Sequence, residues 1–176
     1  NMNINEVIAN RALELLGEEK GNYDYIHPNN HINMGQSTND VLPTSIRVAT
    51  ISLLTKALSE LEGLQKALEA KAEEFDHVLK MGRTHLQDAI PIRLGQEFAS
   101  YAAVIGRDIK RLYRTFEHLE TINLGATAVG TGLNADQNYV KMVTKKLNQI
   151  TGLELTQSDN LVDATQNTDA YVEVSS

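Results

Sequence analysis

The chain has no cysteine, and its 176 residues include only three prolines. Without cysteine there is no disulfide framework, no thiol nucleophile and no thiolate metal site. Because proline interrupts helices, and because the glycines lie mostly at joints between apolar stretches, the composition favours long helices. No apolar run approaches the roughly 20 residues of a membrane-spanning helix, and no signal peptide is visible at the start. We therefore expect no membrane partner.

Basic residues are outnumbered: 16 Lys and Arg stand against 23 Asp and Glu, a net charge of −7. This balance argues against a nucleic-acid partner, because phosphate binding requires a basic face. A small anionic substrate is still compatible, since a local pocket can be positive on an acidic protein. The length suits one domain with a core of its own.

The two ends of the chain suggest an internal piece of a longer protein. Asn1 stands before Met2, and residues 169–176 read as a helix without a glycine or proline stop signal. Trimming of mobile ends is the alternative explanation.

Apolar periodicity predicts an all-α fold with a short irregular or β-hairpin segment near residues 78–92. A first helix is expected over Ile4–Leu16, ended by Gly17, and a polar loop over Glu18–Gln36. The next helix should run from about residue 38 to 75, with Ser37 or Thr38 as its N-cap. At 1.5 Å per residue it would be about 55 Å long. A compact monomer of this size cannot bury such a helix, so helices from other subunits are expected.

The apolar residues expected on the buried side of the first helix are Val7, Ile8, Ala12, Leu15 and Leu16. Those expected on the long helix are Ile46, Ala49, Leu53, Leu54, Ala57, Leu61, Leu64, Leu68, Ala72 and Phe75.

The second half of the chain begins with a break in this pattern. Two short strands are expected at Val78–Met81 and Ala89–Ile92, and a second long helix from Leu94. A turn of small residues follows at Gly125–Gly132, and then two helices near residues 136–151 and 159–175.

The first candidate site is Gln36-Ser37-Thr38-Asn39-Asp40, at the start of the long helix. A helix start offers free backbone N–H groups and a positive dipole end, which suit a carboxylate. Ser37 and Thr38 add hydroxyl donors, and Asn39 can donate or accept. A plain N-cap without a ligand is the alternative interpretation.

The second candidate is Gly82-Arg83-Thr84-His85-Leu86-Gln87-Asp88, in the break between two long helices. Loops held by rigid elements often carry function, and His85 could bind a substrate or relay a proton near neutral pH. Alternatively, His85 is a structural histidine bonded to the backbone.

Two further segments are weaker candidates. The spacing of His27 and His31 resembles a metal pair on a helix, but Pro28 and the two asparagines argue against a helix, and no third ligand is obvious. The Gly125–Gly132 segment lacks the Gly-Lys-Ser/Thr ending and the preceding strand of a phosphate loop. It is better interpreted as a turn where helices or a neighbouring chain approach closely.

Together these segments resemble the fumarase/aspartase superfamily over essentially the whole chain, and five pieces occur in the family's order. They are Asn1–Asn10, His27–Asn30, Gln36–Asp40, Gly82–Ala89 and Gly125–Asn134. Within the superfamily the chain is more similar to aspartases than to class II fumarases, because fumarases usually carry two serines where Ser37-Thr38 stands. Ile90–Phe98 and Leu161–Tyr171 are also aspartase-like. Gly35 replaces a usual serine and is expected to loosen the loop without removing a substrate contact.

The resemblance implies a carbon–nitrogen lyase that converts L-aspartate reversibly to fumarate and ammonia without an organic cofactor, and no residue is assigned to a metal site. By analogy with the family, His85 is catalytic and contacts the amino group together with Asn39. Ser37 and Thr38 would bind the β-carboxylate, and Thr84 the α-carboxylate. His27, Asn29 and Asn30 resemble a second carboxylate site of fumarases, whose role here is left open.

The resemblance also implies a cytoplasmic homotetramer with each active site built from three subunits. Residues 1–37 would end the N-terminal region, and residues 38–176 would begin the central helices. The family's Gly-Ser-Ser loop, which supplies the serine base, does not occur in this sequence, so this piece alone is expected to be inactive. A class II fumarase and a non-catalytic helical relative are the alternatives.

Overall fold

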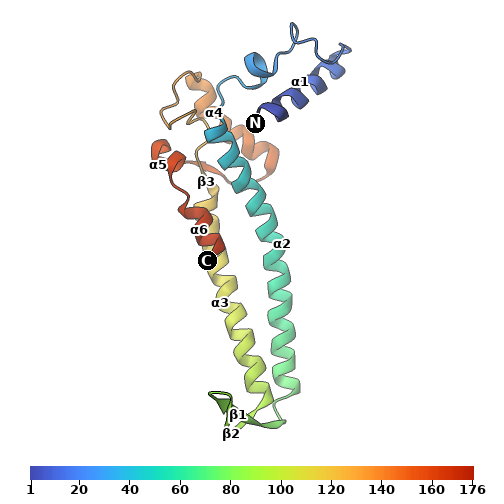
Figure 1. Ribbon diagram of the computed structural model, residues 1–176, viewed down its shortest axis with the longest axis vertical. Coiled ribbons are helices and arrows are strands. Elements are labelled where there is room, and N and C mark those ends of the chain that lie inside the picture. Colours follow the sequence, from blue (N-terminus) through green and yellow to red (C-terminus); the bar gives the residue numbers. More distant parts are fainter. The chain divides into compact units, whose positions relative to one another are not determined.

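The computed structural model describes residues 1–176 as two compact units, which are treated separately below. The first unit comprises residues 1–49 and 117–176, and the second comprises residues 50–116. Helices dominate both, which confirms the predicted fold class (Figure 1).

The helices are α1 (Met2–Leu16), α2 (Thr38–Glu74), α3 (Leu94–Glu120), α4 (Gln137–Thr151), α5 (Leu161–Gln166) and α6 (Asp169–Ser175), with one π-helical turn, η1 (Pro28–Ile32). The strands are β1 (Leu79–Thr84), β2 (Gln87–Arg93), β3 (Thr121–Ile122) and β4 (Thr156–Gln157).

Helix α1 ends as predicted, because Gly17 takes the left-handed conformation with φ 79° that closes many helices. Its predicted buried side is wrong. The buried residues are Asn5, Ala9 and Leu13, whereas Val7, Ile8, Leu15 and Leu16 are exposed. The apolar residues of α1 lie on more than one side, and this chain covers only the side that faces η1 and its flanking loop.

Helix α2 has nearly the predicted bounds, and it too is apolar on more than one side. Leu54, Leu61, Leu68, Ala72 and Phe75 are buried or half-buried as expected. The residues expected with them but found exposed are Ile46, Ala49, Leu53, Ala57 and Leu64. The apolar residues that the sequence grouped together therefore lie on two faces of α2, and this chain covers only one of these faces.

Contrary to the expectation from the sequence, α2 meets the length and composition criteria of a membrane span. A core helix of a soluble protein meets the same criteria. Asp40 and Arg47 are buried on α2, and charged side chains of this kind are costly in lipid. We therefore interpret α2 as a core helix.

In the second unit, the later part of α2 and most of α3 run antiparallel and are joined by the β1–β2 hairpin (Figure 1). Phe75 and Phe98 pack with ring centroids 5.4 Å apart. A Cβ at Gly95 would lie 2.3 Å from the carbonyl oxygen of Ala72, so glycine permits the close approach of α3 to the end of α2. Both strands and the start of α3 at Leu94 were predicted.

In the first unit, the turn at 125–132 packs against α5. Gly130 has φ 95°, and a Cβ there would lie 2.3 Å from Cα of Val162, which confirms the predicted close approach. The parallel pair β3–β4 was not predicted, and β3 does precede this turn. The expected helix over 159–175 is two helices. Asn167 is extended between them, as suits a polar residue that competes with helical hydrogen bonding.

Candidate functional site

The start of α2 is built as a reciprocal cap. The Asn39 N–H donates to Ser37 Oγ at 3.1 Å, and the Ser37 N–H donates to Asp40 Oδ1 at 2.9 Å. Such a box satisfies donors that a helix start would otherwise leave free. The sequence predicted a cap at Ser37 or Thr38, and in the structure Ser37 is the capping residue.

Asp40 also binds a distant segment. Its Oδ2 accepts hydrogen bonds from the backbone N–H groups of Gly125 at 3.1 Å and Thr127 at 3.2 Å. The side chain is fully buried, with 0% of Asp40 exposed. A buried carboxylate is tolerated only with such partners. Asp40 therefore fixes the turn at 125–127 against the start of α2.

The sequence predicted free backbone N–H groups at this helix start, but most of these groups are occupied in the structure. Ser37, Asn39, Asp40 and Val41 all donate within the chain. Thr38 N–H makes no such bond, and neither the Thr38 hydroxyl nor the hydroxyl hydrogen of Ser37 is donated within the chain. Two hydroxyl donors and one amide donor therefore remain available at the positive end of α2.

A pocket of about 350 Å³ opens beside these donors. Its lining residues are Gly35, Gln36, Ser37, Thr127, Ala128, Val129, Thr131, Leu133 and Asn134. The neighbouring Asn39 amide donates to the carbonyl of Ala128 at 2.6 Å, which leaves its Oδ1 free to accept. The polar groups of the pocket are thus hydroxyls and amides, they stand beside the apolar side chains of Ala128, Val129 and Leu133, and no charged side chain lines it.

Tyr139 lies behind this pocket on α4. Burial raises the pKa of its phenol, and the charge of Asp40 raises it further. A Cβ at Gly35 would lie 3.3 Å from Cδ1 of Tyr139, and Gly35 has φ 71°. Glycine suits this left-handed backbone, so it need not loosen the loop as the sequence suggested.

The second candidate segment forms the turn of the β1–β2 hairpin. His85 and Leu86 both have positive φ, 51° and 64°, as the two central residues of a tight hairpin turn between Thr84 and Gln87 require, although residues other than glycine rarely adopt it. Thr84 and His85 are exposed, and their side chains make no hydrogen bond within the chain. The alternative of a structural histidine bonded to the backbone therefore finds no support here.

The His27 segment is a cap rather than a metal pair. Contrary to the expectation of no helix, Pro28–Ile32 forms the π-helical turn η1, since proline is tolerated at a first helical position. His27 Nδ1 accepts from the Asn29 N–H, and His31 Nδ1 accepts from the His27 N–H. No group of three His, Cys, Asp or Glu residues in the chain is arranged to hold a metal ion.

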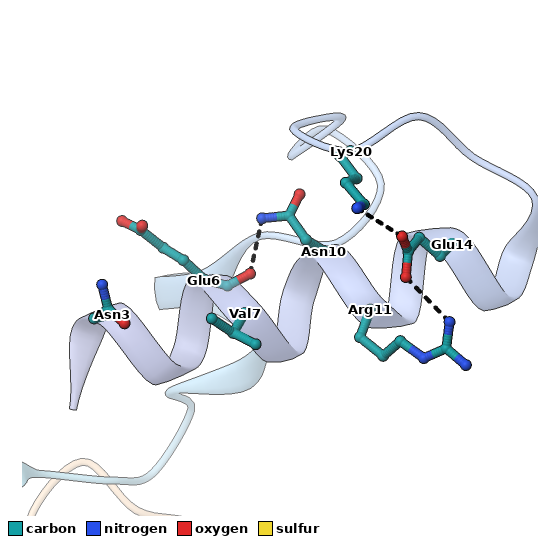
Figure 2. Close-up of a pocket in the computed structure, with 7 residues that line it drawn as sticks. All are labelled: Asn3, Glu6, Val7, Asn10, Arg11, Glu14 and Lys20. Carbon is teal, nitrogen blue, oxygen red and sulfur yellow. Dashed lines mark hydrogen bonds and ion pairs between the residues drawn. The ribbon is translucent and has the colours of Figure 1, made fainter.

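A separate groove of about 510 Å³ follows α1, where Figure 2 shows Arg11 and Lys20 both directed at Glu14. The two ion pairs measure 3.1 Å and 2.7 Å. Lys20 first, and then Arg11, hold the pKa of the Glu14 carboxyl below its usual value. Both cations are already paired, so this groove is a poorer carboxylate site than the pocket beside Ser37.

Comparison with known proteins agrees with this picture. A family model described as "Lyase" matches residues 1–176. The chain belongs to this lyase family. It is 61% identical over 175 residues to an aspartate ammonia-lyase of Bacillus subtilis, covering 99% of the chain and 37% of that relative. The chain thus spans little more than a third of the length of the curated relatives it matches.

Solved structures give the same result for the fold of this lyase chain. A fumarate lyase:delta crystallin from Brucella melitensis, bound to cobalt, matches with a TM-score of 0.92 and 48% identity, over 97% of this chain and 37% of that one. A class II fumarase from Schistosoma mansoni matches with a TM-score of 0.82 and 31% identity, over 99% of this chain and 40% of that one. These matches confirm the predicted superfamily and the predicted similarity to aspartases.

Sequence reasoning missed three residues of this region of the lyase fold. Asp40 was quoted within its motif but given no role, Thr127 was treated as part of a turn, and Asn123 was not considered. Asn123 is buried and donates to the carbonyl of Asn39 at 3.0 Å. The spacing of Ser37 and Asp40 is a local signal for the cap alone, and the contacts of Asp40 and Asn39 with residues 123–127 have no such signal.

Proposed function

We propose that the full-length protein containing this chain converts L-aspartate reversibly to fumarate and ammonia. The observation that supports this most directly is the set of unpaired donors at Ser37 and Thr38, held beside a pocket that no charged side chain lines. Preorganised donors of this kind stabilise a carboxylate whose negative charge increases during reaction. The similarity to aspartate ammonia-lyases gives the substrate class.

In the proposed reaction, a base removes a proton from C3 of L-aspartate, next to the β-carboxylate. The electron pair of the broken C–H bond moves onto that carboxylate, which becomes a doubly negative aci-carboxylate. The pair then returns to form the C2–C3 double bond as the C2–N bond of the protonated amino group breaks, and the electrons of that bond leave with the nitrogen. Ammonia leaves, and fumarate remains.

The residue roles follow from the chemistry of each group. Ser37 and Thr38 donate to the β-carboxylate, where the negative charge accumulates. Asn39 and His85 contact the amino group, and Thr84 binds the α-carboxylate. We assign His27, Asn29 and Asn30 to a second carboxylate site outside the active site. Its backbone donors Asn29 N–H and Asn30 N–H are already taken by His27, so a ligand there would rely on the asparagine side chains.

The proposal includes a cytoplasmic homotetramer that uses no organic cofactor. Residues 1–37 end its N-terminal region, and residues 38–176 begin its central helices. The exposed apolar residues of α2, among them Ile46, Leu53 and Leu64, support burial by other subunits. In such an assembly Thr84 and His85 of one subunit serve the pocket of another.

The decisive experiment offers L-aspartate and L-malate separately to the full-length protein, and follows fumarate by its ultraviolet absorbance and ammonia by a coupled assay. Fumarate and ammonia from aspartate are expected. If the protein forms fumarate from malate but not from aspartate, it is a fumarase. If it converts neither substrate, it is a non-catalytic relative.

A matched pair of variants tests the carboxylate site. Thr38→Val removes an exposed hydroxyl that makes no bond within the chain, so kcat/KM should fall about tenfold or more while Tm stays unchanged. Thr168→Val removes the hydroxyl of another threonine at a helix start, which also makes no capping bond, and should leave both quantities unchanged. Equal kinetics for the two variants would remove Thr38 from the site.

A further inference from the structure

Thr127 has an unusual combination of properties for a turn residue. It is 8% exposed, and its φ is 60°, in the left-handed region. Its N–H is held by Asp40, but its side-chain hydroxyl makes no hydrogen bond within the chain. Thr127 nevertheless lines the same pocket as Ser37.

The backbone of Thr127 has a cost that packing alone does not explain. A β-branched residue in the left-handed region is strained, and such strain persists where the surroundings impose it, often at functional sites. The Thr127 hydroxyl is not one of the fully buried polar atoms that lack a partner, so it reaches the solvent of the pocket. A ligand carboxylate that displaces this water would accept the hydrogen bond that Thr127 can donate.

Asp40 connects Thr127 to the proposed substrate site. One carboxylate oxygen holds the Ser37 N–H, and the other holds the Gly125 and Thr127 N–H groups. Since Asp40 is fully buried, it sets the relative position of the Ser37 and Thr127 hydroxyls.

We propose that Thr127 donates a hydrogen bond to the same substrate carboxylate as Ser37, and that Asp40 is the positioning residue that holds both donors. This inference rests on the proposed lyase function and adds a donor to its carboxylate site. Because the carboxylate gains charge in the aci-carboxylate, the bond strengthens during reaction. Its loss should lower kcat as well as weaken binding.

The test uses Thr127→Gly in the full-length protein. Glycine takes φ 60° without strain and keeps the N–H for Asp40, so the change removes the side chain, with its hydroxyl, and leaves the backbone contact. We expect kcat/KM for L-aspartate to fall about tenfold or more, as for a hydrogen bond to a charged group. The inhibition constant of succinate, a dicarboxylate that cannot react, should rise several-fold, and Tm should change little.

Companion variants separate the hydroxyl from the shape of the side chain. Thr127→Ser should retain kcat/KM within about twofold, and Thr127→Val should lose as much as Thr127→Gly if it folds. Thr156→Val, at an exposed threonine of β4, is the control and should behave as wild type. Asp40→Asn should lower kcat/KM, and less so in the Thr127→Gly background, because the two residues act together.

Two results would overturn the inference. One is a kcat/KM for Thr127→Gly within twofold of wild type, and the other is a loss in Thr127→Ser equal to that in Thr127→Gly. If the wild-type protein does not convert L-aspartate but Thr127→Gly still weakens succinate binding, the lyase proposal fails while the assigned carboxylate contact stands.

Discussion

The side-chain amide of Asn123 donates a hydrogen bond to the backbone carbonyl of Asn39 over 3.0 Å. In a regular helix this carbonyl would accept from the N–H four residues later, but residue 43 is proline and has none. Asn123, from beyond the far end of α3, therefore supplies the donor that the α2 backbone lacks. The first turns of α2, which carry Ser37 and Thr38, depend on this contact.

Asn123→Ala should destabilise the protein by about 1–2 kcal/mol, because it removes a part-buried hydrogen bond and leaves the Asn39 carbonyl without a donor in the chain. Urea unfolding measures the effect. Pro43→Ala restores a backbone N–H, so the cost of Asn123→Ala should be smaller in that background. Equal costs in the two backgrounds would show that Asn123 does not compensate for the proline.

The helices could be predicted because their apolar spacing persists over many residues, as in α2 and α3. Their buried sides could not, since α1 and α2 carry apolar residues on more than one face and periodicity does not say which face this chain covers. The break at Asn167 was missed for a related reason. The apolar residues on both sides of it suggested continuity, while the extended backbone of Asn167 depends on local polar bonds.

The hairpin turn should become more stable in Leu86→Gly. Leu86 is 92% exposed and has φ 64°, so glycine loses no buried area and relieves left-handed strain of about 1 kcal/mol. Tm of the full-length protein should rise. The control Leu79→Gly, at a similarly exposed leucine of β1 with ordinary strand geometry, should lower it. A fall in Tm for Leu86→Gly would mean that the leucine packs in the assembly.

The sequence predicted the local parts of the candidate site but not its long-range contacts. Ser37 and Asp40 follow a capping pattern that is local in sequence, and the hairpin around His85 follows from the break between two helices. Asp40 reaches partners more than 80 residues away, at Gly125 and Thr127. Neither that contact nor the left-handed backbone of Thr127 has a local signal, because tertiary packing produces both.

His85→Ala should lower kcat/KM for L-aspartate by about tenfold or more, the usual range for loss of a hydrogen bond to a charged group, because the imidazole is proposed to contact the amino group. Stability should not change, because the exposed imidazole makes no hydrogen bond within the chain. His77→Ala removes another exposed histidine and should preserve both kinetics and Tm. An unchanged kcat/KM in His85→Ala would end the catalytic assignment.

Tyr139 should make the protein less stable at alkaline pH. Burial, and secondly the charge of Asp40, raise the pKa of Tyr139 in the folded state, whereas in the unfolded chain it titrates near 10. A raised folded pKa means that the unfolded state loses its proton first. The contribution of Tyr139 is therefore complete below about pH 10 and is lost as pH rises through the folded pKa.

Tyr139→Phe cannot ionise, so it should lose less stability than wild type between pH 8.5 and 11, as measured by urea unfolding at each pH. Near neutral pH the two should be nearly equal, since the Tyr139 hydroxyl makes no hydrogen bond within the chain. Tyr25→Phe, at an exposed tyrosine, should retain the wild-type alkaline loss. If Tyr139→Phe loses as much stability as wild type, its phenol is not kept neutral by burial, and the pocket beside Asp40 is more open to water than its geometry indicates.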